Sequence, residues 1–203
     1  YGGYVALAYA GQYGDRIARL VLSGSGHGFR SWQDNIDSYA GFVRTQYPEV
    51  WEQLLTLRAE GVKSSDPRYQ RLNESAVGDL YWYDLANASK RTPPTDPAED
   101  FREAVYFDIL GDDPEVEVGG TMAIFDARPT LAGLRRPTLI TAGRYDRIAA
   151  PHIALEMSRL VPDHRAQLAI FEGSGHAPWI EEADAYFRRL RAFLLDDPHH
   201  VGR

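Results

Sequence analysis

The strongest constraint on the fold is a set of three short, largely apolar runs, each followed closely by a glycine-containing turn. They cover residues 19–22, 137–141 and 167–171. Short continuous runs of this kind are typical of strands buried on both faces, as in a parallel sheet. Helical patterns lie between or beside them, over residues 3–13, 152–160 and 182–195. The alternation of helix and strand predicts an α/β fold.

The middle of the chain has a different character. From about residue 29 to residue 108 no strand pattern is visible, and Trp32, Ile36 and Tyr39 begin a helical apolar stripe. Because strands of the first type resume further on, we interpret this block as a helical insertion rather than an independent helical domain. The expected organisation is a core segment, a helical cap and a second core segment, over residues 1–28, 29–125 and 126–203.

The composition excludes several classes of function. With 203 residues the chain can bury one sizeable core with a smaller attached subdomain. A net charge of −7 argues against a nucleic-acid partner, and the absence of cysteine excludes disulfides and thiolate metal sites. No apolar run approaches the ~18–20 residues of a membrane span, and no signal peptide is visible. We therefore expect a cytoplasmic protein without membrane contact, although a segment before residue 1 could have carried a targeting signal.

No cofactor or metal is expected, because the sequence has neither a phosphate-binding loop nor a dinucleotide fingerprint. The side chains of the His199–His200 pair, Asp196 and Asp197 are of types that can ligate a metal, but we interpret this segment as a polar tail.

Asp146 follows a predicted strand, and Pro151 then opens a helix. Catalytic groups of open α/β sheets collect at the carboxyl ends of strands. An aspartate there can orient an imidazole and stabilise its protonated form. Taken alone, Asp146 could equally cap the helix that follows.

His176 follows the next strand, after the glycines Gly173 and Gly175. Those glycines permit a sharply turning loop that brings the imidazole back over the strand ends. An Asp after one strand and a His after the next, 30 residues later, matches the order Ser…Asp…His of α/β-hydrolases. We predict that Asp146 and His176 form the acid and base of such a triad.

The nucleophile is expected immediately before Tyr1. If a serine stood there, Tyr1 and Gly2 would complete the second half of a G-x-S-x-G elbow. The backbone N–H of Tyr1 would then be one donor of the oxyanion hole, and Gly2 would let the helix pack tightly. A glycine-rich helix start without special role is the alternative. Ser23 and Ser25 lead into the cap, so we expect them to line the loop where cap and core meet.

The chain resembles the proline iminopeptidase branch of the α/β-hydrolases. The resemblance rests on four segments: residues 1–10, 15–22, 137–146 and 173–176. It implies an α/β-hydrolase fold with an inserted helical cap, whose first half would lie before residue 1. It also implies a serine hydrolase that removes N-terminal residues through an acyl-enzyme, acting on a substrate with a free amino terminus.

In that family acidic groups of the cap and rim hold the substrate's ammonium group. One such glutamate directly follows the catalytic Asp, where this chain has Arg147. The other falls near Glu115, with Asp113 or Glu117 as alternatives. The arginine leaves open an esterase or amidase acting on a small metabolite, with Arg147 gripping a carboxylate or pairing with the cap. The acidic run could also be a solvated face.

Aromatic residues could line a substrate pocket or form the cap's own core. Trp179, three residues after His176, is a pocket-rim candidate, and Tyr145 is a further substrate-binding candidate. A third class of function is a non-catalytic binding protein with the same fold, which a non-nucleophilic residue before Tyr1 would favour. The aromatic candidates of the cap are Trp32, Tyr39, Tyr81, Trp82, Tyr83, Tyr106 and Phe107.

Overall fold

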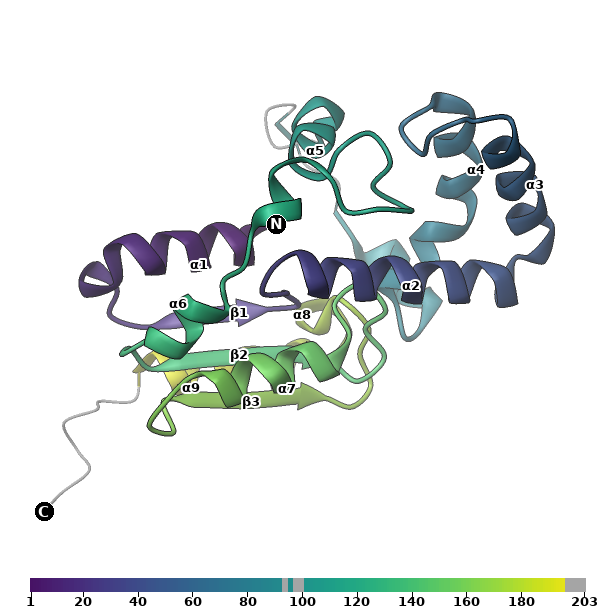
Figure 1. Cartoon of the computed structure of the whole chain (residues 1–203). Helices are drawn as coiled ribbons and strands as arrows, with labels where there is room; N and C mark the ends of the chain where they lie inside the picture. The colour runs from purple at the N-terminus through teal and green to yellow at the C-terminus, as the bar shows by residue number, and fades with distance from the viewer. Residues whose placement is uncertain (93–94, 97–100, 196–203) are drawn as a thin grey trace, which may run out of the picture.

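A computed structural model describes residues 1–92, 95–96 and 101–195 of the chain. Its centre is a parallel sheet of three strands in the order β1-β2-β3 (Figure 1). The strands are Leu20–Ser23, Thr138–Gly143 and Ala166–Phe171, so the predicted parallel sheet is confirmed. Leu20 lies opposite Thr138, which in turn lies opposite Ala166. All six residues of β2 are buried because this strand has a neighbour on each side.

Helices cover both faces of the sheet (Figure 1). On one side lie α1 (Gly2–Tyr13), α6 (Arg128–Gly133) and α7 (Pro151–Leu160), and α6 contacts both of the others. On the other side α9 (Ala183–Leu195) packs against β3, and α8 (Pro178–Glu181) precedes it. The core between these layers is aliphatic, with Leu7, Leu22, Leu131, Ile140, Ile153 and Met157 almost fully buried.

One detail of α9 differs from its sequence pattern. The apolar residues at helical spacing in α9 are Phe187, Leu190, Phe193 and Leu194. Phe193 is buried, whereas Phe187 and Leu194 are exposed. The buried face instead includes Tyr186, whose ring contacts Phe171 of β3 at a centroid distance of 5.5 Å. The face that meets the sheet is therefore rotated relative to the apolar stripe, because Tyr186 supplies the packing.

Between β1 and β2 the described residues form helices and connecting loops. The α-helices are α2 (Phe29–Gln46), α3 (Pro48–Ala59), α4 (Pro67–Val77) and α5 (Glu103–Leu110). The short 3-10 helices are η2 (Gly78–Tyr81), η3 (Leu85–Lys90) and η5 (Gly120–Ile124), while η1 (Gly14–Arg16) precedes β1. We call residues 29–125 the helical insertion. Its two ends meet at an antiparallel bridge between Gly28 and Asp126.

The helical insertion has its own apolar core, separate from that of the sheet. Tyr39 and Val43 of α2 pack there with Leu54, Tyr69 and Leu80. Prolines at the first turn start α3 and α4, and Asp66 caps α4 by accepting a hydrogen bond from the Arg68 backbone N–H. The helical insertion lies beyond the carboxyl ends of the strands, where the candidate site is found (Figure 1).

Candidate active site

Asp146 sits in the loop between β2 and α7 and is almost completely buried. Its Oδ1 atom accepts hydrogen bonds from the backbone N–H groups of Ile148 and Ala149, both at 2.8 Å. These bonds fix the carboxylate just before α7 begins at Pro151. These bonds close a turn within the loop and do not cap α7, whose N-cap is Ala150 and lacks a side-chain cap. The second carboxylate oxygen of Asp146 meets another partner.

That partner is His176, which lies in the loop after β3. Its Nδ1 atom is 2.9 Å from Oδ2 of Asp146. With the proton on Nδ1, the ring donates to the carboxylate and presents Nε2 as a base. The chain can cross the end of β2 here because position 143 is glycine. A Cβ at Gly143 would lie 1.9 Å from the carbonyl oxygen of Gly175.

The helical insertion also holds His176. The backbone N–H of His176 donates to the carbonyl oxygen of Tyr81 at 2.7 Å. The ring of Tyr81 meets the imidazole edge-on, at a centroid distance of 5.4 Å. The histidine therefore lies between the sheet and the helical insertion.

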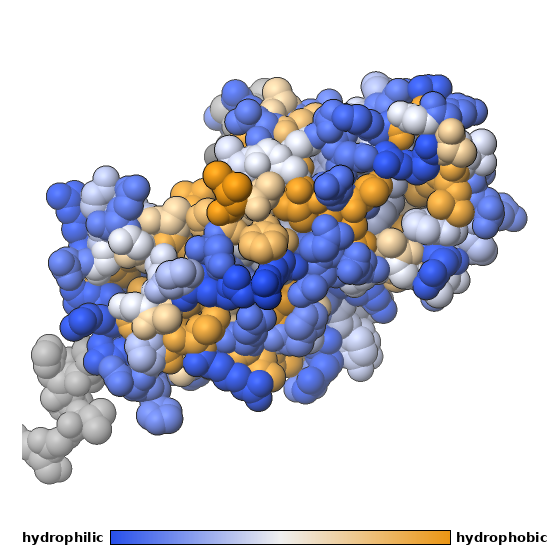
Figure 2. Space-filling model, in the orientation of Figure 1, coloured by the Kyte–Doolittle hydropathy of each residue, from blue (hydrophilic) through white to orange (hydrophobic). Residues whose placement is uncertain are grey.

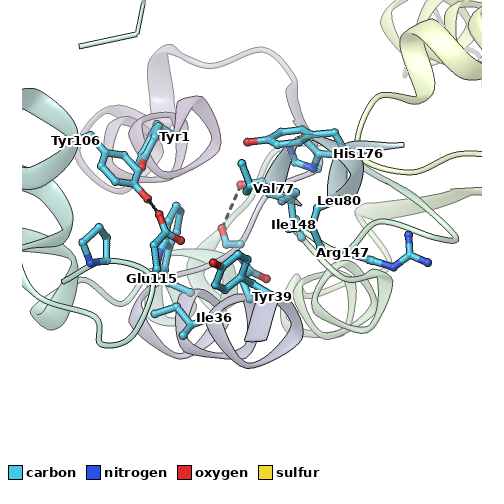
Figure 3. Close-up of a pocket in the computed structure, with 18 of the residues that line it drawn as sticks. Tyr1, Ile36, Tyr39, Val77, Leu80, Tyr106, Glu115, Arg147, Ile148 and His176 are labelled. Atoms are coloured by element: carbon cyan, nitrogen blue, oxygen red, sulfur yellow. Dashed lines mark hydrogen bonds between the residues drawn. The ribbon is translucent and has the colours of Figure 1, made fainter. Parts of the chain in front are cut away.

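A cavity of about 510 Å³ opens between these two parts, and His176 lies in its wall (Figure 3). The sheet side contributes Tyr1, Gly2 and the end of β1. The insertion contributes α2, the end of α4 and the loop around Glu115. Of the seven aromatic candidates, five line this cavity: Trp32, Tyr39, Tyr81, Tyr106 and Phe107. Aromatic residues of the insertion can serve as pocket lining and as core at once, because Tyr39 belongs both to the insertion's core and to the cavity wall.

Glu115 is the acidic group that faces the cavity from the loop after α5. Tyr106 donates a hydrogen bond to its Oε1 atom at 3.0 Å (Figure 3). Burial raises the pKa of Glu115 above its usual 4.5, while the Tyr106 hydrogen bond opposes that shift. Burial likewise raises the pKa of the Tyr1 and Tyr106 phenols, so both are neutral donors at physiological pH.

The two alternative carboxylates lie elsewhere. Asp113 forms an ion pair with Arg58 at 2.7 Å and accepts a hydrogen bond from the Ser64 backbone N–H at 2.8 Å. Glu117 lines a separate surface cleft beside His27. Among the three, Glu115 is therefore the carboxylate that a molecule inside the cavity would meet.

Tyr1 lies at the start of α1, and its carbonyl oxygen accepts the backbone N–H of Tyr4 at 2.9 Å. Its ring stacks on Trp32 at a centroid distance of 5.5 Å. The close approach of helix and loop occurs at Gly3 rather than at Gly2. A Cβ at Gly3 would lie 1.8 Å from Oγ of Ser25, whereas no described atom lies within 4 Å of one at Gly2.

Three predicted substrate-binding residues are placed away from the centre of the cavity. Arg147 belongs to the cavity wall, but its guanidinium stacks over Phe42 at 5.1 Å and points away from the cavity centre (Figure 3). Trp179 is an exposed neighbour of His176, with ring centroids 6.3 Å apart, and does not line the cavity. Tyr145 stacks on Tyr83 at 4.3 Å, also outside it.

Ser23 and Ser25 both line the cavity from the end of β1. Thr141 donates to the Ser23 hydroxyl at 2.8 Å, and the Ser25 hydroxyl donates to the Gly26 carbonyl at 3.1 Å. The Ser23 hydroxyl thus links β1 to β2, whereas the Ser25 hydroxyl makes a local bond within the loop that follows β1.

Two polar residues of the site were not found from sequence. Asn35, one helical turn after Trp32, lines the cavity, and its Oδ1 atom is buried without a hydrogen-bond partner among the residues described. Glu181 lies behind the histidine loop. Neither belongs to a recognisable motif, although Glu181 stands only five residues after His176.

Within the described part of the chain, no helix combines the length and apolar character needed to cross a membrane. The His199–His200 pair, with Asp196 and Asp197, lies outside the described residues.

The order of elements and the Asp–His pair above the strand ends define an α/β-hydrolase. The chain matches the model of the alpha/beta hydrolase fold family over residues 1–183 and belongs to that family. It is 26% identical to a proline iminopeptidase of Thermoplasma volcanium and 24% identical to one of Saccharolobus solfataricus. Both matches cover 96% of this chain, but only 62% and 59% of those relatives.

The fold likeness extends to solved structures. The crystal structure of proline iminopeptidase from Mycobacterium smegmatis superimposes with a TM-score of 0.66 at 20% sequence identity. The match covers 95% of this chain and 61% of that one. The chain thus spans about three-fifths of the length of the relatives it matches.

Proposed function

We propose that the protein is a serine hydrolase that cleaves an N-terminal aminoacyl or prolyl amide through an acyl-enzyme. The observation that carries the proposal is that His176, held by Asp146, shares one cavity with Tyr1 and Glu115. A base, a helix start and a partly buried carboxylate are three of the features that this reaction would use besides its nucleophile. The similarity to proline iminopeptidases points the same way.

The proposed nucleophile is a serine directly before Tyr1. Its hydroxyl would attack the substrate carbonyl while Nε2 of His176 takes the proton. Asp146 would stabilise the resulting imidazolium, and the Tyr1 N–H would donate to the oxyanion. His176 would then protonate the leaving amine, and water activated by the same base would release the acyl group.

Glu115 would give the reaction its preference for a free amino terminus. An ammonium group in the cavity would form a charge-assisted hydrogen bond with the Glu115 carboxylate, and the surrounding aromatic rings would contact the side chain. Binding at this point would hold the scissile carbonyl near the base. The outward-pointing guanidinium of Arg147 gives no support to a substrate carboxylate at that position.

The decisive test is carried out on the intact natural protein with a fluorophosphonate probe and intact-mass analysis. The proposal expects one adduct on a serine immediately before Tyr1. It also expects hydrolysis of prolyl or alanyl arylamides, with the N-acetylated arylamides as matched controls that lack the ammonium group. Equal rates on free and acetylated substrates would favour an esterase or amidase. A protein without adduct or turnover would be a binding protein.

A further inference from the structure

The loop that carries His176 is tied to the helical insertion through one side chain, that of Glu181. Glu181 is the last residue of α8, five positions after the histidine. Its Oε2 atom accepts the backbone N–H of Gly175 at 2.6 Å. This bond holds the residue directly before His176.

The other carboxylate oxygen of Glu181 reaches the helical insertion. Oε1 accepts the backbone N–H groups of Tyr83 and Asp84 at 3.0 and 3.1 Å, and the Asn87 amide approaches it at 3.4 Å. A carboxylate with two oxygens can satisfy donors on both sides at once. Glu181 thus joins two segments that are about ninety residues apart in the sequence.

Backbone contacts make the junction tight. His176 N–H donates to the Tyr81 carbonyl, and a Cβ at Gly175 would lie 2.5 Å from that same oxygen. The neighbouring Glu182 provides a contrast. Its Oε2 accepts from Gly173 N–H at 2.9 Å and from the Ser174 hydroxyl at 2.6 Å, both within the histidine loop.

We propose that Glu181 is a positioning residue that makes the working position of His176 depend on the docking of residues 81–84 of the helical insertion. When this segment is docked, the Gly175–His176 backbone is fixed between Glu181 and Tyr81, and the imidazole meets Asp146. When it moves away, His176 loses the Tyr81 carbonyl, and Glu181 loses the Tyr83 and Asp84 N–H groups that hold its carboxylate against Gly175. The helical insertion also forms part of the cavity wall. His176 therefore reaches its working position only when the insertion closes the cavity. The inference rests on the proposed function only in that His176 acts as the base.

The substitution that tests this is Glu181→Gln in the intact protein, with Glu182→Gln as the matched control. Glutamine keeps the size of the side chain but faces at least one backbone N–H with its own donor group. In E181Q the amides of Tyr83, Asp84 and Gly175 should all exchange with deuterium at least about tenfold faster. In E182Q the faster exchange should be confined to residues 173–174.

Two further readouts separate positioning from simple stabilisation. The NMR signal of the His176 Nδ1–H, which reports its bond to Asp146, should broaden or disappear in E181Q. This readout does not depend on turnover, so it remains decisive even if the proposed reaction is wrong. With an active substrate, kcat should fall about 10- to 100-fold while KM changes less than about threefold, because Glu181 is not in the cavity wall.

An E181Q protein with an unchanged Nδ1–H signal and an unchanged kcat would overturn the proposal, whatever its melting temperature. So would faster exchange at Gly175 alone, because the insertion would then be docked without Glu181.

Discussion

The backbone of Gly24 lies against the imidazole of His176. A Cβ at position 24 would be 3.0 Å from Cε1 and 3.2 Å from Nδ1 of that ring. Gly24 directly follows β1 and has a φ of +51°, in the left-handed region where glycine is favoured. Its N–H donates to the Thr141 carbonyl of β2 at 3.0 Å. The end of β1 therefore forms a floor that fixes how far the imidazole can approach the sheet.

Gly24→Ala should displace the base. The added methyl group requires His176 to shift by a few tenths of an ångström and imposes backbone strain of about 1 kcal/mol. We expect kcat to fall about tenfold or more, with a modest loss of stability. Steady-state kinetics and thermal unfolding measure the two effects. Gly41→Ala is the control, because Gly41 lies within α2 with no atom within 4 Å of its Cβ position. An active, equally stable G24A protein would contradict the contact.

Asp146→Asn should nearly abolish turnover while leaving the fold intact. The asparagine Oδ1 can still accept from Ile148 and Ala149, so the turn before α7 is preserved. Its amide group replaces Oδ2 and presents a donor to Nδ1 of His176, which forces the ring into the wrong tautomer. Loss of this orientation costs about 10⁴-fold in kcat in comparable triads. A melting temperature close to wild type, with turnover retained, would remove Asp146 from the mechanism.

Glu115→Gln should raise KM selectively for substrates with a free amino group. Glutamine still accepts the Tyr106 hydrogen bond but carries no charge for an ammonium group. A charge-assisted hydrogen bond contributes about 1.5–3 kcal/mol, which corresponds to about 10- to 100-fold in KM. The N-acetylated arylamides should show almost no change. Equal effects on both substrate types would mean that Glu115 shapes the cavity but does not bind the ammonium group.

The same carboxyl should make stability depend on pH. Burial raises the pKa of Glu115 above its ordinary 4.5, so the folded state binds the proton more tightly than the unfolded state. The contribution of Glu115 to the free energy of unfolding is then fully present below that ordinary value and is lost as the pH rises through the folded-state pKa. E115Q lacks this loss, so its melting temperature should exceed that of wild type increasingly from pH 4 towards pH 7. Parallel melting curves for the two proteins across this range would refute the assignment.

Arg147→Ala should have little effect on catalysis. The guanidinium stacks on Phe42 of α2, a contact worth about 0.5–1 kcal/mol at a partly exposed position. We expect a small drop in the free energy of unfolding and a KM within about twofold of wild type for every substrate. A large rise in KM for a substrate that carries a carboxylate would instead support the alternative function, an esterase or amidase acting on a small metabolite. Denaturant unfolding and a two-substrate comparison are sufficient to decide.

The sequence alone determined the elements of the fold and the chemical pair at its centre. Apolar runs identify the strands of a parallel sheet because they must be buried on both faces, and each ends in a turn with glycine. Asp146 and His176 follow two such strands, and parallel strands end at the same edge. Topology thus implies that they lie close together, and the structure places Nδ1 of His176 2.9 Å from Oδ2 of Asp146.

The tertiary structure decided which neighbours of that pair face the cavity. Arg147 and Tyr145 are the sequence neighbours of Asp146, but the Arg147 guanidinium stacks on Phe42 and the Tyr145 ring stacks on Tyr83, so neither group points to the centre of the cavity. Choosing Glu115 over Asp113 likewise required knowing that Arg58 engages Asp113. The bond from Glu181 to Tyr83 joins residues 98 apart and follows no local periodicity. Side-chain direction and long-range docking depend on packing between elements, whereas strand, helix and turn depend on the residues within each element.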